Sequence, residues 1–369
     1  KDHLFNEAKV MALGQEILHN YPAFELELFI RNVVDRFPAL ELKERITWIS
    51  SNLRQFLPPN FREATSIIIA ALPDPLDETK SDNDFGDFIH APYSEFVARY
   101  GCTSEDLFFS LEALKEITKR FSAEYAIRKF INAFPTTTME VIKGWCYDDN
   151  YHVRRLCSEG TRAKLPWGQK IDIHPLSTLE ILDILHADNT RFVTRSVANH
   201  LNDLAKSHPQ DIIDRLEKWM NVQKQSPSEI QFIVKHSLRN LVKDGHPRAL
   251  SMLGVSDARG VIIQNLQYPS DTAIGSVLKF SFDVHSTSSK RIMIDYIVYF
   301  RNKQGLMNRK KIHKLQSFDI EQNKSIAIHK KHPLRANMTT RQLYPGTHKV
   351  EIQVNGEILA SFHFELREH

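Results

Sequence analysis

Glu159 is the residue whose neighbours in the sequence most clearly suggest chemistry. It lies four residues after Arg155 and three before Arg162, so the three side chains share one face of a helix. Nearby cations favour the ionised form of a carboxylate. Such a carboxylate can stabilise a developing positive charge or orient and deprotonate a water molecule. We predict a catalytic role for Glu159, although the same spacing also fits a surface ion pair.

Trp167 is the second candidate. It directly follows Pro166, which we expect to end the helix that carries Glu159, so the indole should lie in a loop. The face of an indole ring attracts cations. The alternative is a core position between two helices, and the sequence pattern favours neither.

Two further carboxylates accompany them. Glu124 follows Ser122 at the expected start of the preceding helix, where an acid would also suit the helix dipole. Asp203 shares a helix face with Asn199 and either joins the site or anchors Arg195. The 17 histidines show no metal-ligand spacing, so we predict no metal site.

The elements that position these residues repeat along the chain. Val153, Val193 and Ile233 are 40 residues apart, and each is expected to begin an amphipathic helix. Ile127 begins a shorter, earlier unit. A period near 40 residues with two helices per unit is typical of HEAT repeats, which stack into a solenoid.

A cation follows two residues after each of these apolar positions. The resulting stripe continues at helical spacing and suits a phosphate backbone, although any single cation could instead belong to an exposed ion pair. The predicted DNA-binding residues of the helical part are Arg154, Arg155, Arg162, Lys164, Arg195, Asn199, Lys235, Arg239 and Lys243.

The hydrophobic period changes from helical to two near Val261. Up to about Gly254 the pattern is helical, except for a surface excursion expected over Leu76–Tyr93, which is rich in Asp, Pro and Gly. From Val261 onward about seven short strands fit, and no Cys lies among them. We predict a mainly α chain: a HEAT-repeat α-solenoid over residues 1–256, followed by an immunoglobulin-like β-sandwich over 257–369 without the usual disulfide.

Composition and charge bound the cellular setting and the partners. The 369 residues are 42% hydrophobic and 25% charged, as in soluble globular proteins, and no run is long enough to span a membrane. The first residues carry acids and no hydrophobic core of a signal peptide. The odd number of cysteines matches no zinc spacing and indicates free thiols in a reducing cytoplasm.

The net charge of +3 is unevenly distributed. From Ala258 onward there are 17 Lys and Arg against 9 Asp and Glu, a balance of +8, whereas the remainder stands at −5. Basic clusters occur at Arg309, Lys310 and Lys311 and again at Lys330 and Lys331. These residues predict that the C-terminal domain grips DNA, and the alternative is that the domain only caps the last helical repeat.

The segment Ser-Glu-Gly-Thr-Arg…Leu-Pro-Trp, residues 158–167, is the part of the sequence most specific to a known family. This segment, together with 195–206 and 234–243, resembles the AlkC branch of the HEAT-like-repeat DNA glycosylases, and the similarity spans roughly Phe5–Gly254. Some members of that branch carry a C-terminal immunoglobulin-like domain, in agreement with the strands predicted above.

The resemblance implies base excision repair of cationic alkylated bases, such as N3-methyladenine and N3-methylcytosine, in duplex DNA. It also implies that the enzyme needs no metal or cofactor and need not enclose the damaged nucleotide. We further expect a monomer with no obligate protein partner and no membrane contact. Such a base leaves as a neutral molecule, so it needs no general acid, and positive charge builds on the deoxyribose beside the carboxylates. No amine is marked for a Schiff base, so we expect hydrolysis alone, leaving an abasic site. Glu124, Glu159, Trp167 and Asp203 are the predicted catalytic residues.

Two rival interpretations remain at this stage. HEAT solenoids commonly bind proteins, and a non-enzymatic scaffold would show apolar or aromatic anchors along its binding face. In a DNA-structure-binding protein without catalysis, we would expect other residues in place of Glu124 and Glu159. The segment 158–167 and the presence of Glu124 and Glu159 favour the enzyme.

Overall fold

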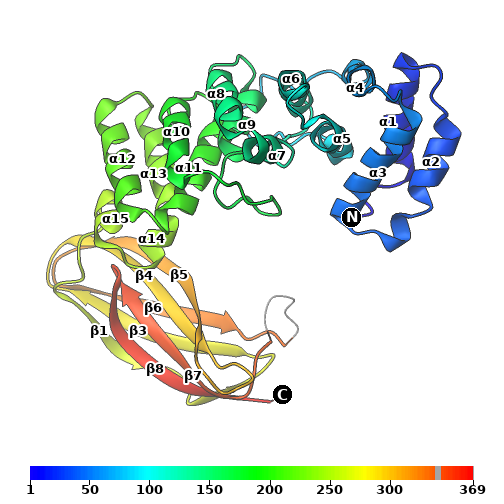
Figure 1. Ribbon diagram of the computed structural model, residues 1–369. Coiled ribbons are helices and arrows are strands. Elements are labelled where there is room, and N and C mark those ends of the chain that lie inside the picture. Colours follow the sequence, from blue (N-terminus) through cyan, green and yellow to red (C-terminus); the bar gives the residue numbers. More distant parts are fainter. Residues whose placement is uncertain (337–341, 369) are drawn as a thin grey trace. The chain divides into compact units, whose positions relative to one another are not determined.

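The computed structural model describes residues 1–336 and 342–368, which form two compact units (Figure 1). The first unit comprises Lys1–His208 and Asp214–Ser237, and the second comprises Pro209–Ile213 and the chain from Leu238 onward. Helices build the first unit, and the strands all belong to the second. The predicted order, helices and then a β domain, is confirmed, whereas the boundary at residues 256 and 257 stays a prediction.

The helices of the first unit are mostly 7 to 15 residues long and are joined by turns. They are α1 (Glu7–Asn20), α2 (Leu26–Val34), α3 (Leu42–Phe56), α4 (Phe61–Ala70), α5 (Ala91–Gly101), α6 (Leu107–Thr118), α7 (Ile127–Ala133), α8 (Pro135–Trp145), α9 (Tyr151–Glu159), α10 (Leu179–Leu185), α11 (Arg191–Ala205), α12 (Pro209–Val222, in this unit from Asp214) and α13 (Pro227–Ser237), with the 3-10 turns η1 (Phe37–Ala39), η2 (Phe88–His90) and η3 (Pro175–Thr178).

The predicted repeat is visible in how these helices pack. Helix α11 packs against α9 on one side and against α13 on the other (Figure 1). Val153, Val193 and Ile233, the residues that define the 40-residue period, are each fully buried on these three helices. Burying one apolar face per helix against its neighbours is what stabilises a stacked repeat.

The third repeat differs from the prediction. Ile233 does not begin a helix but lies in the second half of α13, which ends at Ser237. Leu238 follows with φ −91° and ψ 3°, outside α-helical values, and a new helix begins at Arg239. The predicted stripe from Lys235 to Lys243 is therefore not continuous, because its residues belong to two helices and two units.

The predicted surface excursion is shorter than expected. Residues 72–87 contain no helix, but η2 begins at Phe88 and α5 at Ala91. Tyr93, the expected end of the excursion, is fully buried in α5. We call residues 72–87 the 72–87 segment.

The second unit contains two short helices and, within the described residues, eight strands. They are α14 (Arg239–Lys243), α15 (Pro247–Met252), β1 (Val261–Gln267), β2 (Asp271–Ala273), β3 (Val277–Ser286), β4 (Lys290–Phe300), β5 (Arg309–Ile320), β6 (Lys324–Pro333), β7 (Gly346–Val354) and β8 (Glu357–Arg367). All seven predicted strands occur, and the short β2 is additional.

The strands form two sheets that enclose a common core. One sheet has the order β1-β3-β6 and the other β2-β8-β7-β4-β5, and every pairing is antiparallel except that of β2 with β8. Alternate residues of β3, such as Leu278 and Phe280, point into the core, as do Ile294 of β4 and Phe364 of β8. This alternation explains the period of two in the sequence.

Candidate active site

Glu159 lies at the C-terminal end of α9, not in the middle of the helix as the sequence suggested. Asn150 caps the start of α9 through a hydrogen bond from the His152 backbone N–H, and Gly160 caps its end. Only 5% of Glu159 is exposed. Pro166, expected to end this helix, follows seven residues after its last residue.

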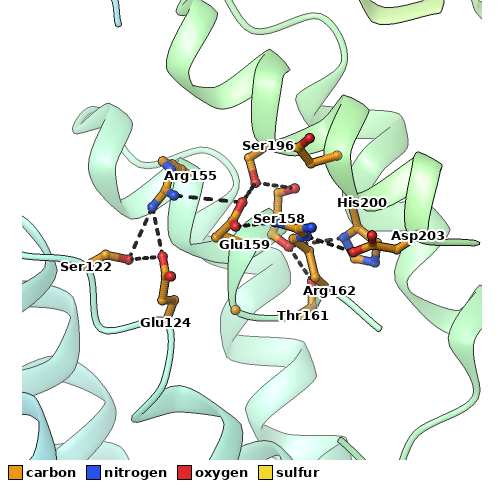
Figure 2. Close-up of polar contacts among 12 residues, drawn as sticks. Ser122, Glu124, Arg155, Ser158, Glu159, Thr161, Arg162, Ser196, His200 and Asp203 are labelled. Atoms are coloured by element: carbon orange, nitrogen blue, oxygen red, sulfur yellow. Dashed lines mark hydrogen bonds and ion pairs between the residues drawn. The ribbon is translucent and has the colours of Figure 1, made fainter. Parts of the chain in front are cut away.

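Three side chains surround the Glu159 carboxylate (Figure 2). Arg162 Nη1 donates to Oε1 at 2.6 Å, and Ser196 Oγ of α11 donates to Oε2 at 2.6 Å. Arg155 Nη2 forms an ion pair with Oε2 at 3.8 Å. Arg162 lies beyond the end of the helix, and the turn at residues 160–162 folds it back onto Glu159.

These neighbours keep Glu159 ionised. Burial alone would raise the pKa of Glu159, but the charges of Arg155 and Arg162 and the hydrogen bonds from Ser196 and Arg162 together lower it below its ordinary value. The carboxylate is therefore a fixed anion at neutral pH.

Arg155 connects Glu159 to Glu124. Its Nη1 lies 3.1 Å from Glu124 Oε2 and 3.3 Å from Ser122 Oγ, and Ser122 itself donates to Glu124 Oε2 at 2.8 Å (Figure 2). Glu124 lies in a turn three residues before α7 and not in the first turn of that helix. One guanidinium thus bridges two carboxylates that are 35 positions apart in the sequence.

Asp203 of α11 binds Arg162, not Arg195 as one alternative had it. Arg162 Nε donates to Asp203 Oδ2 at 2.9 Å, so Arg162 also lies between two carboxylates (Figure 2). The charges of Glu159 and Asp203 and their hydrogen bonds outweigh burial and raise the pKa of Arg162. Asp203 therefore holds Arg162 in place against Glu159.

Several supporting residues of this network were not identified from the sequence. Arg128 of α7 is 1% exposed and donates to the carbonyl oxygens of Gly160, Arg162 and Gln169, which fixes the turn after α9. Burial, followed by the charge of Arg162, lowers the pKa of Arg128 to about 10. His200 of α11 is fully buried and contacts the Ser158 carbonyl oxygen at 3.1 Å. Burial lowers the pKa of His200 to about 3, so it is neutral.

Trp167 is exposed and is not a core residue. Its exposed fraction is 64%, its φ is +63°, and the Lys43 ammonium donates to its carbonyl oxygen. The left-handed backbone is rare for a bulky residue and turns the indole away from the core. Trp167 and Tyr125 line a pocket of about 400 Å³.

A larger pocket adjoins Glu124, one of the two carboxylates that Arg155 bridges. It has a volume of about 850 Å³, and Ser122, Glu124 and Arg155 line one part of it. Phe85 and Phe192 line another. Tyr125 lines both pockets, and burial, with the charges of Glu124 and Glu159, raises its pKa to about 12.

The predicted DNA-binding residues have different surroundings. Arg154 forms an ion pair with Asp188 at 2.6 Å and donates to two carbonyl oxygens, so it joins helices and does not face solvent. Arg195 is paired with Asp82 and Asn83 of the 72–87 segment. Asn199 contacts His236 at 2.9 Å, and Arg155 and Arg162 belong to the carboxylate network.

The remaining predicted DNA-binding residues lie at the surface. Lys164 and Lys235 are exposed in the first unit. Of the predicted residues in the second unit, Arg239 is half-buried, and Lys243, Arg309, Lys310 and Lys311 are exposed. The last three open the edge strand β5.

Within residues 1–336 and 342–368, no group of three or more His, Cys, Asp or Glu side chains could hold a metal ion. No helix in the same ranges is long and apolar enough to cross a bilayer. All three cysteines are free thiols.

The chain is similar to known proteins over nearly its whole length. Residues 263–368 match the family model described as the C-terminal Ig-like domain of the uncharacterised protein YhaZ. The uncharacterized protein YhaZ of Bacillus subtilis (strain 168) is 29% identical over 368 residues, which cover 98% of each chain. The alkylpurine DNA glycosylase AlkC of Pseudomonas fluorescens, solved bound to DNA containing an abasic site analog, is similar with a TM-score of 0.88 and 32% identity over 99% of each chain.

Proposed function

Because this chain belongs to the AlkC family of DNA glycosylases, with a C-terminal immunoglobulin-like domain, we propose that it excises cationic alkylated bases such as N3-methyladenine and N3-methylcytosine from duplex DNA. The observation that carries this proposal is the Arg155 bridge between Glu124 and Glu159. It links the carboxylate of Glu124, which lines an open pocket, to the buried carboxylate of Glu159. That arrangement suits a reaction in which positive charge builds on a sugar.

The reaction starts with a base that is already a cation. The bond between the base nitrogen and C1′ breaks with both electrons going to the base, which leaves as a neutral molecule. The deoxyribose becomes an oxocarbenium ion, and the fixed negative charge of Glu159 lowers the energy of this state. Since the base needs no proton, a general acid is unnecessary.

Glu124 is the residue that we assign to water. Both of its hydrogen bonds, from Ser122 and Arg155, reach Oε2, and its side chain lines the larger pocket. We assign Oε1 to the attacking water, whose oxygen bonds to C1′ and whose proton passes to the carboxylate. Trp167 presents its indole face to the cationic base or sugar.

We also propose how the protein assembles, where it acts and how its domains are divided. The protein acts as a monomer on duplex DNA in the cytoplasm, without metal or cofactor, and leaves an abasic site without cutting the strand. Its glycosylase domain comprises residues 1–256 and its immunoglobulin-like domain residues 257–369. The family-model match over residues 263–368 supports this division.

The test is incubation with alkylated duplex DNA, followed by mass spectrometry of the released bases. We expect free N3-methyladenine and N3-methylcytosine, abasic sites, intact strands and undiminished activity in the presence of a chelator. Glu180→Gln is the matched control for the site variant Glu159→Gln, because Glu180 is an exposed glutamate paired with Lys143. Failure to release any base would overturn the proposal, and a covalent adduct trapped by borohydride would overturn simple hydrolysis.

A further inference from the structure

Two aromatic rings face the guanidinium that bridges the candidate carboxylates. The guanidinium carbon of Arg155 lies 4.4 Å from the ring centroid of Phe192 and 5.9 Å from that of Phe85. The two rings contact each other edge to face, with centroids 5.1 Å apart. Arg155 therefore has carboxylates on its hydrogen-bonding edge and aromatic rings beside its plane.

Phe85 is not a core residue. It is 57% exposed, whereas Phe192, in the first turn of α11, is only 3% exposed. An exposed phenylalanine on an irregular segment gains little from burial, so packing alone does not explain its position.

The 72–87 segment is nevertheless firmly attached around Phe85. The Phe192 N–H donates to the Ser81 carbonyl oxygen at 2.9 Å, and Tyr151 donates to Asp84 at 3.3 Å. Gly86 pairs with Phe121, and a Cβ at Gly86, whose φ is +70°, would lie 1.8 Å from the Arg120 carbonyl oxygen. Only glycine fits there, so the close packing of Gly86 against Arg120 fixes the backbone conformation beside Phe85.

We propose that Phe85 and Phe192 are positioning residues, which hold the Arg155 guanidinium between Glu124 and Glu159 and so make the 72–87 segment a part of the active site. Cation–π attraction keeps Arg155 in one orientation without competing for its N–H donors. This inference rests on the proposed function and adds two residues and one segment to it.

The position of Arg155 matters because its charge helps to keep Glu159 ionised. Arg162 exerts the same effect from the other side. The other ionisable groups near Glu159 are Glu124 and Tyr125 before α7, Arg128 of α7, and His200 and Asp203 of α11. If Arg155 loses its fixed place, the pKa of Glu159 rises, so the carboxylate becomes protonated closer to neutral pH.

The experiment compares Phe85→Leu, Phe192→Leu and the ring-preserving Phe85→Tyr. Phe108→Leu is the matched control, since Phe108 is 64% exposed on α6. We expect the two site leucine variants to lower kcat by about 3- to 30-fold with little change in KM, the range that a cation–π contact gives. The acid limb of their kcat–pH profile should move to higher pH. Phe85→Tyr, which keeps the ring, should retain the wild-type kcat and the wild-type acid limb. Phe108→Leu should behave as wild type.

A second measurement does not depend on excision. In side-chain NMR spectra, the Arg155 Nε–H signal, assigned with Arg155→Lys, should be sharp in the wild type and broadened by Phe85→Leu. Unchanged kcat, pH profile and Arg155 signal in Phe85→Leu would overturn the inference. So would activity that falls only in step with thermal stability. If the wild type excised nothing, the proposed function would fail, and the Arg155 signal would still test the positioning.

Discussion

Ser196 on α11 donates a 2.6 Å hydrogen bond to Glu159 at the end of α9, so the candidate catalytic carboxylate is also a contact between consecutive repeats. Ser196 Oγ also lies 3.0 Å from Ser158 Oγ. The site is therefore assembled by the packing of α9 on α11 and does not exist within one helix.

Replacing Ser196 by alanine should move the pH dependence of excision. The hydrogen bond from Ser196 lowers the pKa of Glu159, so its loss raises this pKa and shifts the acid limb of kcat to higher pH. The lowered pKa of Glu159 in the folded state contributes stability above its unfolded pKa, which is lost as pH falls through the folded value. Ser196→Ala should therefore lose about 1–2 kcal/mol at pH 7 and less in acid. Ser51→Ala, whose hydroxyl binds only a backbone carbonyl in the same helix, is the control for denaturation curves and kcat–pH profiles.

Glu159→Gln should reduce excision by about 10²-fold or more, because the fixed negative charge disappears while the shape is kept. Arg155 retains Glu124 and Arg162 retains Asp203, so neither arginine loses every carboxylate. We expect a folded protein that still binds undamaged DNA. Single-turnover kinetics and urea unfolding separate the two effects, and activity lost only in proportion to the unfolded fraction would assign Glu159 a purely structural role.

Trp167→Ala should lower the excision rate by about 3- to 30-fold, less than Glu159→Gln, with the melting temperature unchanged. The indole is 64% exposed, so its removal leaves no cavity. Trp167→Gly should melt at the same temperature or slightly higher, because φ +63° costs glycine little. Tyr147→Ala, at a residue 72% exposed, is the control. A large drop in melting temperature for Trp167→Ala would contradict the assignment.

Asp82→Asn should strengthen binding to undamaged DNA. Asp82 pairs with Arg195, and its neutralisation leaves that arginine available to a phosphate. If Arg195 then neutralises one more phosphate, the log–log salt slope steepens by about 0.9. Asp74→Asn makes the same charge change at an exposed place in the same segment and should alter the slope less. Equal slopes in fluorescence-anisotropy titrations of the two variants would refute the competition.

The basic cluster on the edge strand β5 tests whether the C-terminal domain grips DNA. Replacing Arg309, Lys310 and Lys311 together by alanine should flatten the salt slope by about two to three units, since each phosphate contact contributes roughly 0.9. All three side chains are exposed, so the fold should persist. Lys324→Ala, an exposed lysine at the start of β6, is the control. An unchanged slope with full activity would favour the alternative that this domain only caps the helical repeats.

Repeat periodicity predicted the helical elements, and helical spacing accounts for the contact of Arg155 with Glu159 on α9. Arg162 also contacts Glu159, but through the turn that follows the helix. The pairing of Arg162 with Asp203 spans 41 residues and depends on how α9 packs on α11. Arg154 shows what residue type alone does not reveal. Its neighbour Arg155 reaches the carboxylates of the site, whereas Arg154 binds Asp188 instead, although both residues carry the same charge.

The contacts of the 72–87 segment could not be predicted from its sequence. Its Asp, Pro and Gly content predicted a surface excursion, and composition carries no information about what an exposed Phe85 contacts. Arg128 was missed for a related reason. A buried arginine that binds three backbone carbonyl oxygens has no sequence signature, since the partners are not side chains.

The succession of contacts from Glu124 through Arg155 and Glu159 to Ser196 crosses three neighbouring parts of the helical stack: the turn before α7, α9 and α11. Any flexing of the stack along this direction must lengthen or shorten these contacts, because each of the three carries one end of a hydrogen bond or ion pair. The geometry of the candidate site therefore depends on how these three parts of the stack are packed together.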